Sequence, residues 1–135
     1  MATLDDVATF LASACSLTVG TSLFKGRMPE GAQDEAAALY EYGGMSSEYT
    51  FGTSGVTFER PRMQVVLRGE PNDYSGPRET AETAYRAMAA VGNQSLGSTR
   101  YMLLEPIQAP FFLKRDENSR FYIAFNVQAM KELSA

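Results

Sequence analysis

The chain has 135 residues, of which 44% are hydrophobic and 21% are charged, values typical of one soluble globular domain over residues 1–135. It contains no histidine and one cysteine, Cys15, which excludes imidazole-based acid–base catalysis, Ser/His and Cys/His nucleophile pairs and an intramolecular disulfide. The formal net charge of −4 argues against a nucleic-acid-binding protein that relies on a broad basic surface.

The N-terminal stretch MATLDDVATF lacks the basic start and the apolar core of a secretory signal. No apolar run approaches the ~20 residues that a membrane-spanning helix needs. We therefore expect a protein that is made in the cytosol and has no membrane partner. Because histidine is absent and cysteine occurs once, no motif points to a metal or a cofactor, and we expect neither.

The N-terminal residues carry the signals of a helix. Thr3 can cap its start, and Asp5 and Asp6 place two carboxylates in the first turn, where the helix dipole favours negative charge. Apolar residues then recur at helical spacing. These features predict a helix over residues 4–15.

Three of the following segments alternate in polarity as strands do. Residues 17–25 predict a first strand, and residues 36–42 predict a second that ends at the Gly43-Gly44 pair. Residues 61–69 predict a third strand. The proline at its start confines that part of the strand to a sheet edge or a bulge.

The connection between the second and third strands is long and rich in Gly, Ser and Thr. Within it, the stretches EYTF and VTFE flank GTSG, a spacing typical of a hairpin, so we expect either a loop or a hairpin over residues 45–58. A segment of this length inside one domain is more often functional, or ordered on assembly. The aromatic residues around it are either core or interface anchors: Tyr40, Tyr42, Tyr49, Phe51 and Phe58.

The second half of the chain predicts a helix and a closing set of strands. Gly76 and Pro77 suit a helix start, and the apolar spacing that follows predicts a helix over 77–91. Residues 100–113 are extended with interrupting prolines, and residues 119–130 alternate strictly between two faces. This order of elements predicts an α+β domain with one mostly antiparallel, twisted sheet and two helices packed on one face. The other face and the edges of such a sheet are available to neighbours.

Motifs that could indicate catalysis fail on geometry. Ser22 and Lys25 have the Ser-x-x-Lys spacing of some serine acyl-enzymes, but in a strand residues three apart point to opposite faces. Asn93-Gln94-Ser95 matches a glycosylation acceptor, yet without a secretory signal it indicates only a polar loop. Three carboxylate pairs are adjacent in sequence and are interpreted as solvated charges: Asp5 and Asp6, Asp34 and Glu35, Asp116 and Glu117. We therefore expect no enzymatic activity.

Two groups of charged residues are candidates for contacts with a partner. Arginines an even number apart on the third strand would share one face, as a partner-binding stripe or as ordinary exposed residues: Arg60, Arg62 and Arg68. The polar stretch 115–119 between two apolar runs predicts the turn of a hairpin. Its charges of both signs either form salt bridges with a neighbouring subunit or keep the turn soluble: Lys114, Arg115, Asp116, Glu117 and Arg120.

Several segments match one family in their order and spacing. They are LFKGRMP at 23–29, YGG at 42–44, ERPRMQVVLRG at 59–69 followed by Asp73-Tyr74, and PFFLKRDENSR at 110–120. In these segments the chain resembles bacteriophage tail terminator proteins, also described as minor capsid or tail-completion proteins. The resemblance extends over nearly the whole chain, although the GTSG segment and Asn118-Ser119 depart from the family pattern.

The resemblance implies a structural protein without enzymatic activity. It implies a ring, usually a hexamer, that binds the head-proximal end of the tail tube, stops tube growth and joins the tail to the head or neck. The implied partners are further copies of the chain, the tail tube protein and a head-completion or neck protein. The implied location is the virion tail, after synthesis in the host cytoplasm. DNA would pass through the ring lumen without sequence-specific binding, and we expect the acidic balance to suit such a lumen.

Two other functions remain open on the sequence. The chain could be another head–tail joining protein or a tail-tube subunit, since those would share its size and composition. It could also be a small ligand-binding domain or enzyme, although the missing histidines and the absence of a site motif oppose that interpretation.

Overall fold

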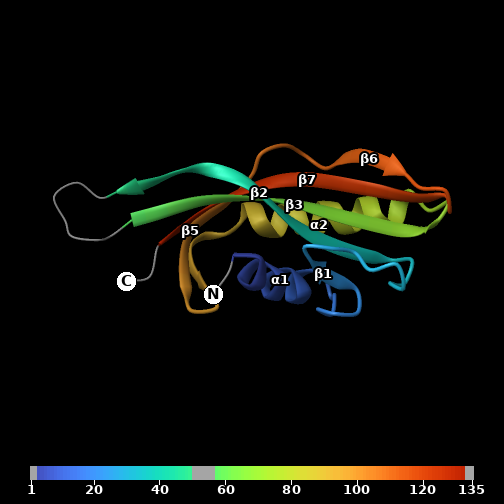
Figure 1. Ribbon diagram of the computed structural model, residues 1–135, viewed down its shortest axis with the longest axis horizontal. Helices are drawn as coiled ribbons and strands as arrows, with labels where there is room; N and C mark the ends of the chain where they lie inside the picture. Colours follow the sequence, from blue (N-terminus) through green and yellow to red (C-terminus); the bar gives the residue numbers. More distant parts are fainter. Residues whose placement is uncertain (1–2, 50–56, 133–135) are drawn as a thin grey trace.

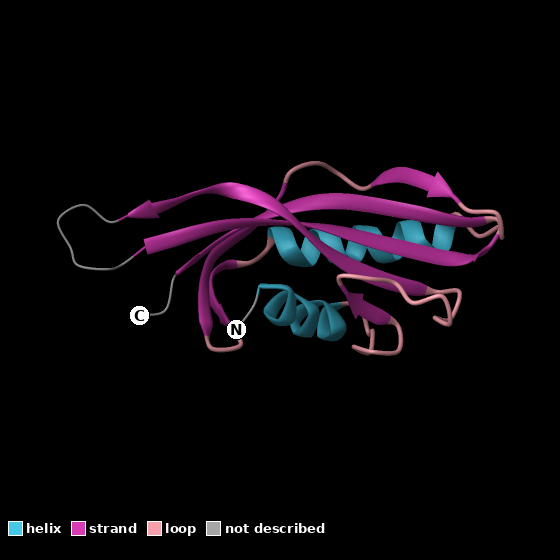
Figure 2. Cartoon of the chain, in the orientation of Figure 1, coloured by secondary structure: helices cyan, strands magenta, loops and turns pink. Residues whose placement is uncertain are grey.

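A computed structural model describes residues 3–49 and 57–132. These residues form a seven-stranded, mostly antiparallel sheet with two helices packed against one of its faces (Figures 1 and 2). The α+β fold predicted from the sequence is therefore confirmed. The elements are α1 (Thr3–Ala14), β1 (Leu23–Lys25), β2 (Ala36–Tyr49), β3 (Thr57–Pro71), α2 (Ser75–Ala89), β4 (Gly92–Leu96), β5 (Thr99–Pro106), β6 (Phe111–Arg115) and β7 (Arg120–Glu132).

The sheet is organised around its longest strands. Its order is β1-β2-β3-β7-β5-β4, and β6 pairs with β7 outside this path. β5 pairs with the C-terminal half of β7, while β6 pairs with its N-terminal half. All these pairs are antiparallel except β1 with β2, which is parallel.

The core lies between the sheet and the two helices. Alternate residues of β7 face it, because side chains of a strand alternate between faces, and Ile123, Phe125 and Val127 are fully buried there. One face of each helix closes the layer, with Val7 and Leu11 from α1 among the buried residues. The two predicted helices are confirmed, with ends that differ by one or two residues. None of the described helices is long and apolar enough to cross a membrane.

The predicted strand over 17–25 is wrong except at its end, since only Leu23–Lys25 forms β1. Before it the chain turns tightly: the backbone N–H groups of Ser22 and Leu23 both donate to the Thr18 carbonyl, and the Ser22 hydroxyl accepts from the Thr18 N–H. Gly20 takes a φ of 91°, which favours glycine. Backbone hydrogen bonds to the Thr18 carbonyl and one bond to the Ser22 hydroxyl therefore replace the strand pairing that the alternation predicted.

The second predicted strand does not end at the Gly43-Gly44 pair, because β2 continues to Tyr49. A register shift lies between Tyr42, opposite Arg62, and Met45, opposite Arg60. Pro61 lies between those two partners, so of the two predicted alternatives, an edge or a bulge, the irregularity at a bulge is confirmed; the prediction that the strand starts at this proline is wrong, because β3 begins at Thr57. The strands of a hairpin extend into residues 45–58, whereas the GTSG turn at residues 52–55 lies outside the described residues.

The polar loop expected at Asn93-Gln94-Ser95 is wrong, because these residues lie in β4, which pairs with β5. Their side chains are exposed and only Leu96 of the strand is buried. An edge strand can form through backbone pairing on one side while most of its side chains stay exposed, so most of its residues can be polar. That composition concealed the strand in the sequence.

A buried hydrogen bond links the first helix to the β4–β5 hairpin. The Tyr101 hydroxyl, fully buried, donates to Asp6 Oδ2 at 2.8 Å, and the Asp6 side chain is itself buried. Burial and the neighbouring carboxylate raise the pKa of the Tyr101 hydroxyl well above its ordinary value. The bond therefore persists across the neutral range.

Replacing Tyr101 by phenylalanine should destabilise the fold by about 1–3 kcal/mol, because a buried carboxylate loses a hydrogen-bond donor. Urea unfolding at neutral pH measures the loss. Tyr85→Phe is the matched control: the Tyr85 ring contacts Phe125 edge-on at 5.9 Å, but its hydroxyl makes no hydrogen bond to the described residues, so a loss below about 0.5 kcal/mol is expected. Equal losses in the two variants would contradict this role of the bond.

Candidate interaction surfaces

The described residues contain no cluster suited to catalysis. Ser22 and Lys25 do not face each other as a reactive pair: the Ser22 hydroxyl accepts from the Thr18 N–H, and Lys25 Nζ pairs with Asp5 Oδ1 at 2.6 Å. Within residues 3–49 and 57–132, no three Asp, Glu, Cys or His side chains converge as metal ligands do.

The charged turn between β6 and β7 is held by one carboxylate. Asp116 Oδ1 accepts from the backbone N–H groups of Asn118 and Arg120, each at 3.0 Å. Its Oδ2 accepts from Arg120 Nε at 2.9 Å and from the Tyr122 hydroxyl at 3.0 Å. The predicted hairpin turn is thus confirmed, and two of its expected contact residues pair with each other inside the subunit.

Two arginines join this hairpin to the segment before β2. Arg120 Nη1 lies 3.1 Å from Asp34 Oδ1. Arg68, which is 7% exposed, donates to the carbonyls of Asp34 at 3.0 Å and Gln33 at 2.8 Å. The guanidinium groups of Arg68 and Arg120 therefore bind the segment before β2 of their own subunit and stabilise its position.

The expected arginine stripe on β3 is not an exposed row of three. Arg68 is buried, and Arg62 is half-buried with its Nε donating to Gln128 Oε1 of β7 at 3.1 Å. Arg60, two residues before Arg62 on β3, is also half-buried.

Some charges of the hairpin do face outward. Lys114, Arg115 and Glu117 are exposed. Lys114 Nζ lies 4.7 Å from the centre of the Tyr122 ring, and the Arg115 guanidinium lies over the Phe121 ring while it donates to the Ser119 hydroxyl. Neither cation forms a salt bridge with a described carboxylate, so both are available to a partner.

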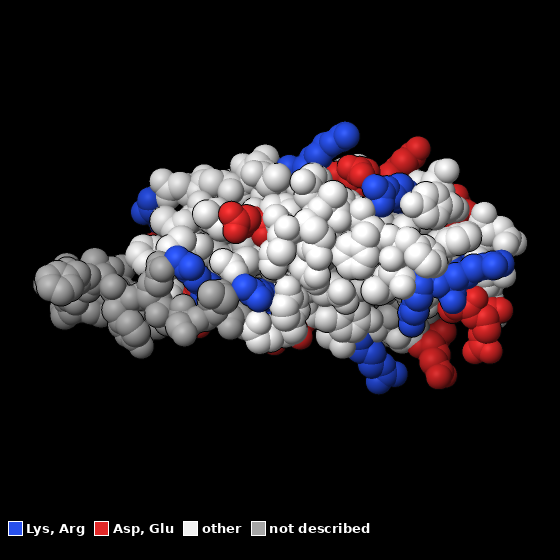
Figure 3. Space-filling view, turned by 90° about the horizontal axis from the view of Figure 1, so that it is seen from above, with Lys and Arg blue, Asp and Glu red and all other residues white. Residues whose placement is uncertain are grey.

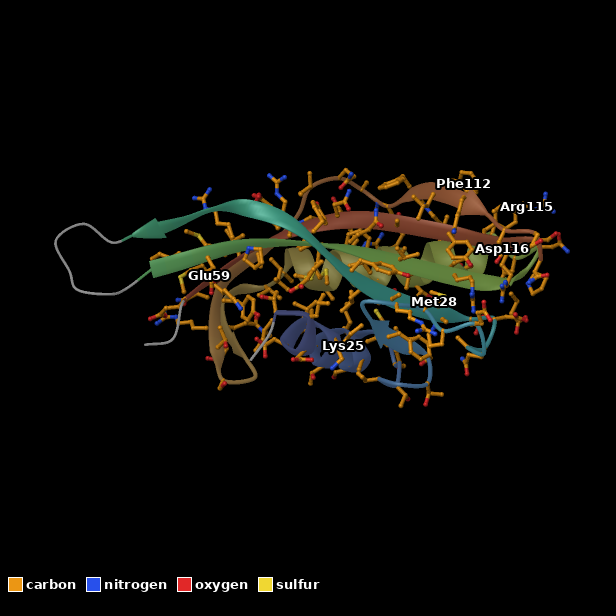
Figure 4. All side chains as sticks on the ribbon, in the orientation of Figure 1. Lys25, Met28, Glu59, Phe112, Arg115 and Asp116 are labelled. Carbon is orange, nitrogen blue, oxygen red and sulfur yellow. The ribbon has the colours of Figure 1, made fainter. Side chains whose placement is uncertain are left out.

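An exposed aromatic cluster lies beside these cations and was not predicted. We call Tyr74, Phe112, Leu113 and Phe121 the aromatic edge. Phe121 contacts Tyr74 and Phe112 edge-on, at 5.6 and 6.1 Å between ring centres. Phe112 is 51% and Leu113 38% exposed, and Figure 4 shows Phe112 on β6 near Arg115. The signal was the Phe111-Phe112-Leu113 run, because three successive apolar residues of an edge strand cannot all face the core.

The face of the sheet opposite the helices carries a second surface. Tyr40, Gln64 and Asn126 are neighbours across β2, β3 and β7. Together with Glu41 and Tyr42 they line a shallow depression, which we call the outer hollow. Tyr42 is 41% exposed. The space-filling view from this side shows a broad central area without Lys, Arg, Asp or Glu (Figure 3).

The aromatic residues expected near the long connection are only partly described. Phe58 is half-buried on β3, where it pairs with Glu48 of β2 and Glu132 of β7. Tyr49 pairs with Thr57 through the backbone. Phe51 lies outside the described residues. Their role as interface anchors stays a prediction.

An α+β subunit whose strand edges and outer face are not covered by any described element is typical of proteins that assemble with other subunits. The sequence agrees with this class. Residues 10–133 match the family model described as "Bacteriophage tail terminator protein", so the chain belongs to the bacteriophage tail terminator family. The protein is accordingly a structural protein of the virion and not an enzyme.

Solved structures support the fold. A chain of the "Virion of native gene transfer agent (GTA) particle" superposes with a TM-score of 0.66 over 98% of this chain and 96% of that chain, at 12% sequence identity. A comparison with curated proteins gives no match. At that identity the structural likeness speaks for the fold, and the family model carries the membership.

The Asp116 contacts predict a pH-dependent stability. Partial burial raises the pKa of this carboxyl, but hydrogen bonds from the Arg120 N–H, the Tyr122 hydroxyl and the Arg120 guanidinium outweigh it, so the net pKa is lowered. A carboxyl with a lowered folded pKa stabilises the fold fully above its unfolded pKa, about 3.9, and loses this contribution as the pH falls through the folded value.

Asp116→Asn should therefore unfold more easily than the parent by about 1–3 kcal/mol at pH 7, and this difference should shrink below about pH 4. Urea unfolding from pH 3 to pH 8 measures it. Glu117→Gln, in the same turn but exposed, should match the parent at every pH. If the difference in unfolding free energy between Asp116→Asn and the parent stayed constant down to pH 3, the charge of Asp116 would contribute nothing to stability.

Proposed function

We propose that the protein forms a closed ring, a hexamer, that caps the head-proximal end of the tail tube. The cap stops tube polymerisation and presents a surface that joins the tail to the head or neck. The family match over residues 10–133 carries this proposal. The partners are other copies of the chain, the tail tube protein and a head-completion or neck protein.

The uncovered strand edges support assembly into a ring. β6 has β7 as its strand neighbour on one side, β4 has β5, and β1 covers β2 only from Ala37 to Leu39. Edge strands are templates for pairing with another chain. When a contact joins two different surfaces of identical subunits, repetition closes a ring if the rotation permits it. Such a ring needs no further component.

Passage of DNA through the lumen fits the charge of the chain. With a net charge of −4, the subunit has no excess of cations that would retain phosphates by releasing their counterions. We propose a lumen without a continuous basic lining, through which DNA slides without sequence-specific binding. An arginine-lined channel in the assembled ring would contradict this proposal.

Electron microscopy of the purified protein, with and without polymerised tail tubes, tests the cap. We expect closed rings, and one ring seated at a single end of each tube, because the two ends of a polar tube expose different surfaces of the tube subunits. Tubes incubated in buffer alone are the control for bare ends. Incorporation along the tube would identify a tail-tube subunit instead, and a monomer that ignores tubes would contradict the proposed function.

A further inference from the structure

We propose that the ring contact joins the β6 edge of one subunit to the open edge of β2 in a second copy. In this contact, Phe112 and Leu113 of the first copy lie against the outer hollow of the second. The inference rests on the proposed ring and specifies which surfaces meet in it. It follows from the free edges, the exposed apolar side chains and the charges of the two strands.

The β6 edge has the properties of a docking strand. Its five residues pair with β7 on one side, so the outward-facing N–H and C=O groups of this strand lack a described strand partner. Phe112 and Leu113 are exposed although apolar. Lys114 and Arg115 lie on the same strand, and neither forms a salt bridge with a described carboxylate. Like charges would oppose pairing of two β6 strands, so this edge favours an acidic partner strand.

The β2 edge supplies that partner. β1 pairs with β2 only over Ala37–Leu39, so from Tyr40 to Tyr49 the strand has β3 on one side and an open edge on the other. The sequence of this stretch contains Glu41 and Glu48 and no Lys or Arg. The exposed Glu41 lines the outer hollow together with Tyr40 and the exposed Tyr42, and aromatic rings can contact both apolar side chains and cations.

The two edges cannot meet within one subunit. β3 and β7 separate β2 from β6, and three strand spacings of about 4.8 Å place them roughly 14 Å apart. A contact between them must therefore join different copies, and when it is repeated head to tail it closes a ring if the rotation permits. Another edge strand, β4, presents Asn93, Gln94 and Ser95, which carry no charge to match Lys114 and Arg115.

Disulfide trapping tests this pairing in the full chain with Cys15 replaced by serine. Leu113→Cys is combined with Gly43→Cys, because a Cβ added at Gly43 meets no atom within 4 Å. The matched control combines Leu113→Cys with Gln94→Cys, which places the second thiol on the exposed β4 edge. An intramolecular disulfide is excluded for the first pair, since its strands lie far beyond the ~7 Å that a disulfide spans between Cα atoms.

Mild oxidation of assembled protein should give the Leu113/Gly43 pair a covalent ladder that ends at the full ring, on a non-reducing gel. The Leu113/Gln94 control and the single variants should stop at dimers or remain uncoupled. A ladder in the β4 control alone would overturn the β2 assignment while leaving the ring intact. Rings that form without a ladder in either pair would likewise overturn it. Absence of rings in the parent protein would instead contradict the proposed function.

A charge exchange gives a second, independent readout. Lys114→Glu with Arg115→Glu should raise the protein concentration needed for half-assembly at least tenfold, and adding Glu41→Lys should recover most of that loss. Arg86→Glu with Arg100→Glu changes the net charge equally at exposed sites away from β6 and β2 and should leave assembly unchanged. Analytical ultracentrifugation measures the protein concentration at which half of the subunits are assembled. Equal effects of the two double variants, or no recovery with Glu41→Lys, would contradict the contact.

Discussion

Strand β7 is the element on which the rest of the structure depends. It pairs with β3 along one side and with both β5 and β6 along the other. Its alternate residues form the centre of the core against α2, where Ala81, Ala84 and Met88 are buried. Because side chains alternate strictly, a slip of one residue would turn the buried set toward solvent, so the register of three neighbouring strands is fixed by this one.

The sequence predicted this strand well, since its alternation is long and unbroken. It predicted both helices for a similar reason. The prediction was wrong at residues 17–22, where local bonds to the Thr18 carbonyl and to the Ser22 hydroxyl form a turn instead of a strand. The sequence concealed β4, because an edge strand buries almost nothing and needs no apolar pattern. A pattern of alternating polarity therefore predicts a strand only where no local hydrogen bond competes, and it does not reveal a strand that buries few side chains.

Some contacts of the candidate residues could be predicted from the sequence, and others could not. Asp116 and Arg120 are close in sequence, and a turn brings them together, so a charged turn was predictable. Arg68 was not, because its acceptors are carbonyls 34 and 35 residues away. The aromatic edge depends on the approach of Tyr74 to a distant hairpin. Contacts between remote segments therefore decided which charges stabilise the subunit and which face outward.

A subunit with exposed edge strands suits the assembly role that we propose. The direct measure of termination is the length distribution of tail tubes polymerised with increasing amounts of this protein. We expect elongation to stop at a ratio of about one ring per tube, with capped tubes that no longer grow when fresh tube subunits are added. Tubes that continue to lengthen at an excess of rings would contradict a terminating role.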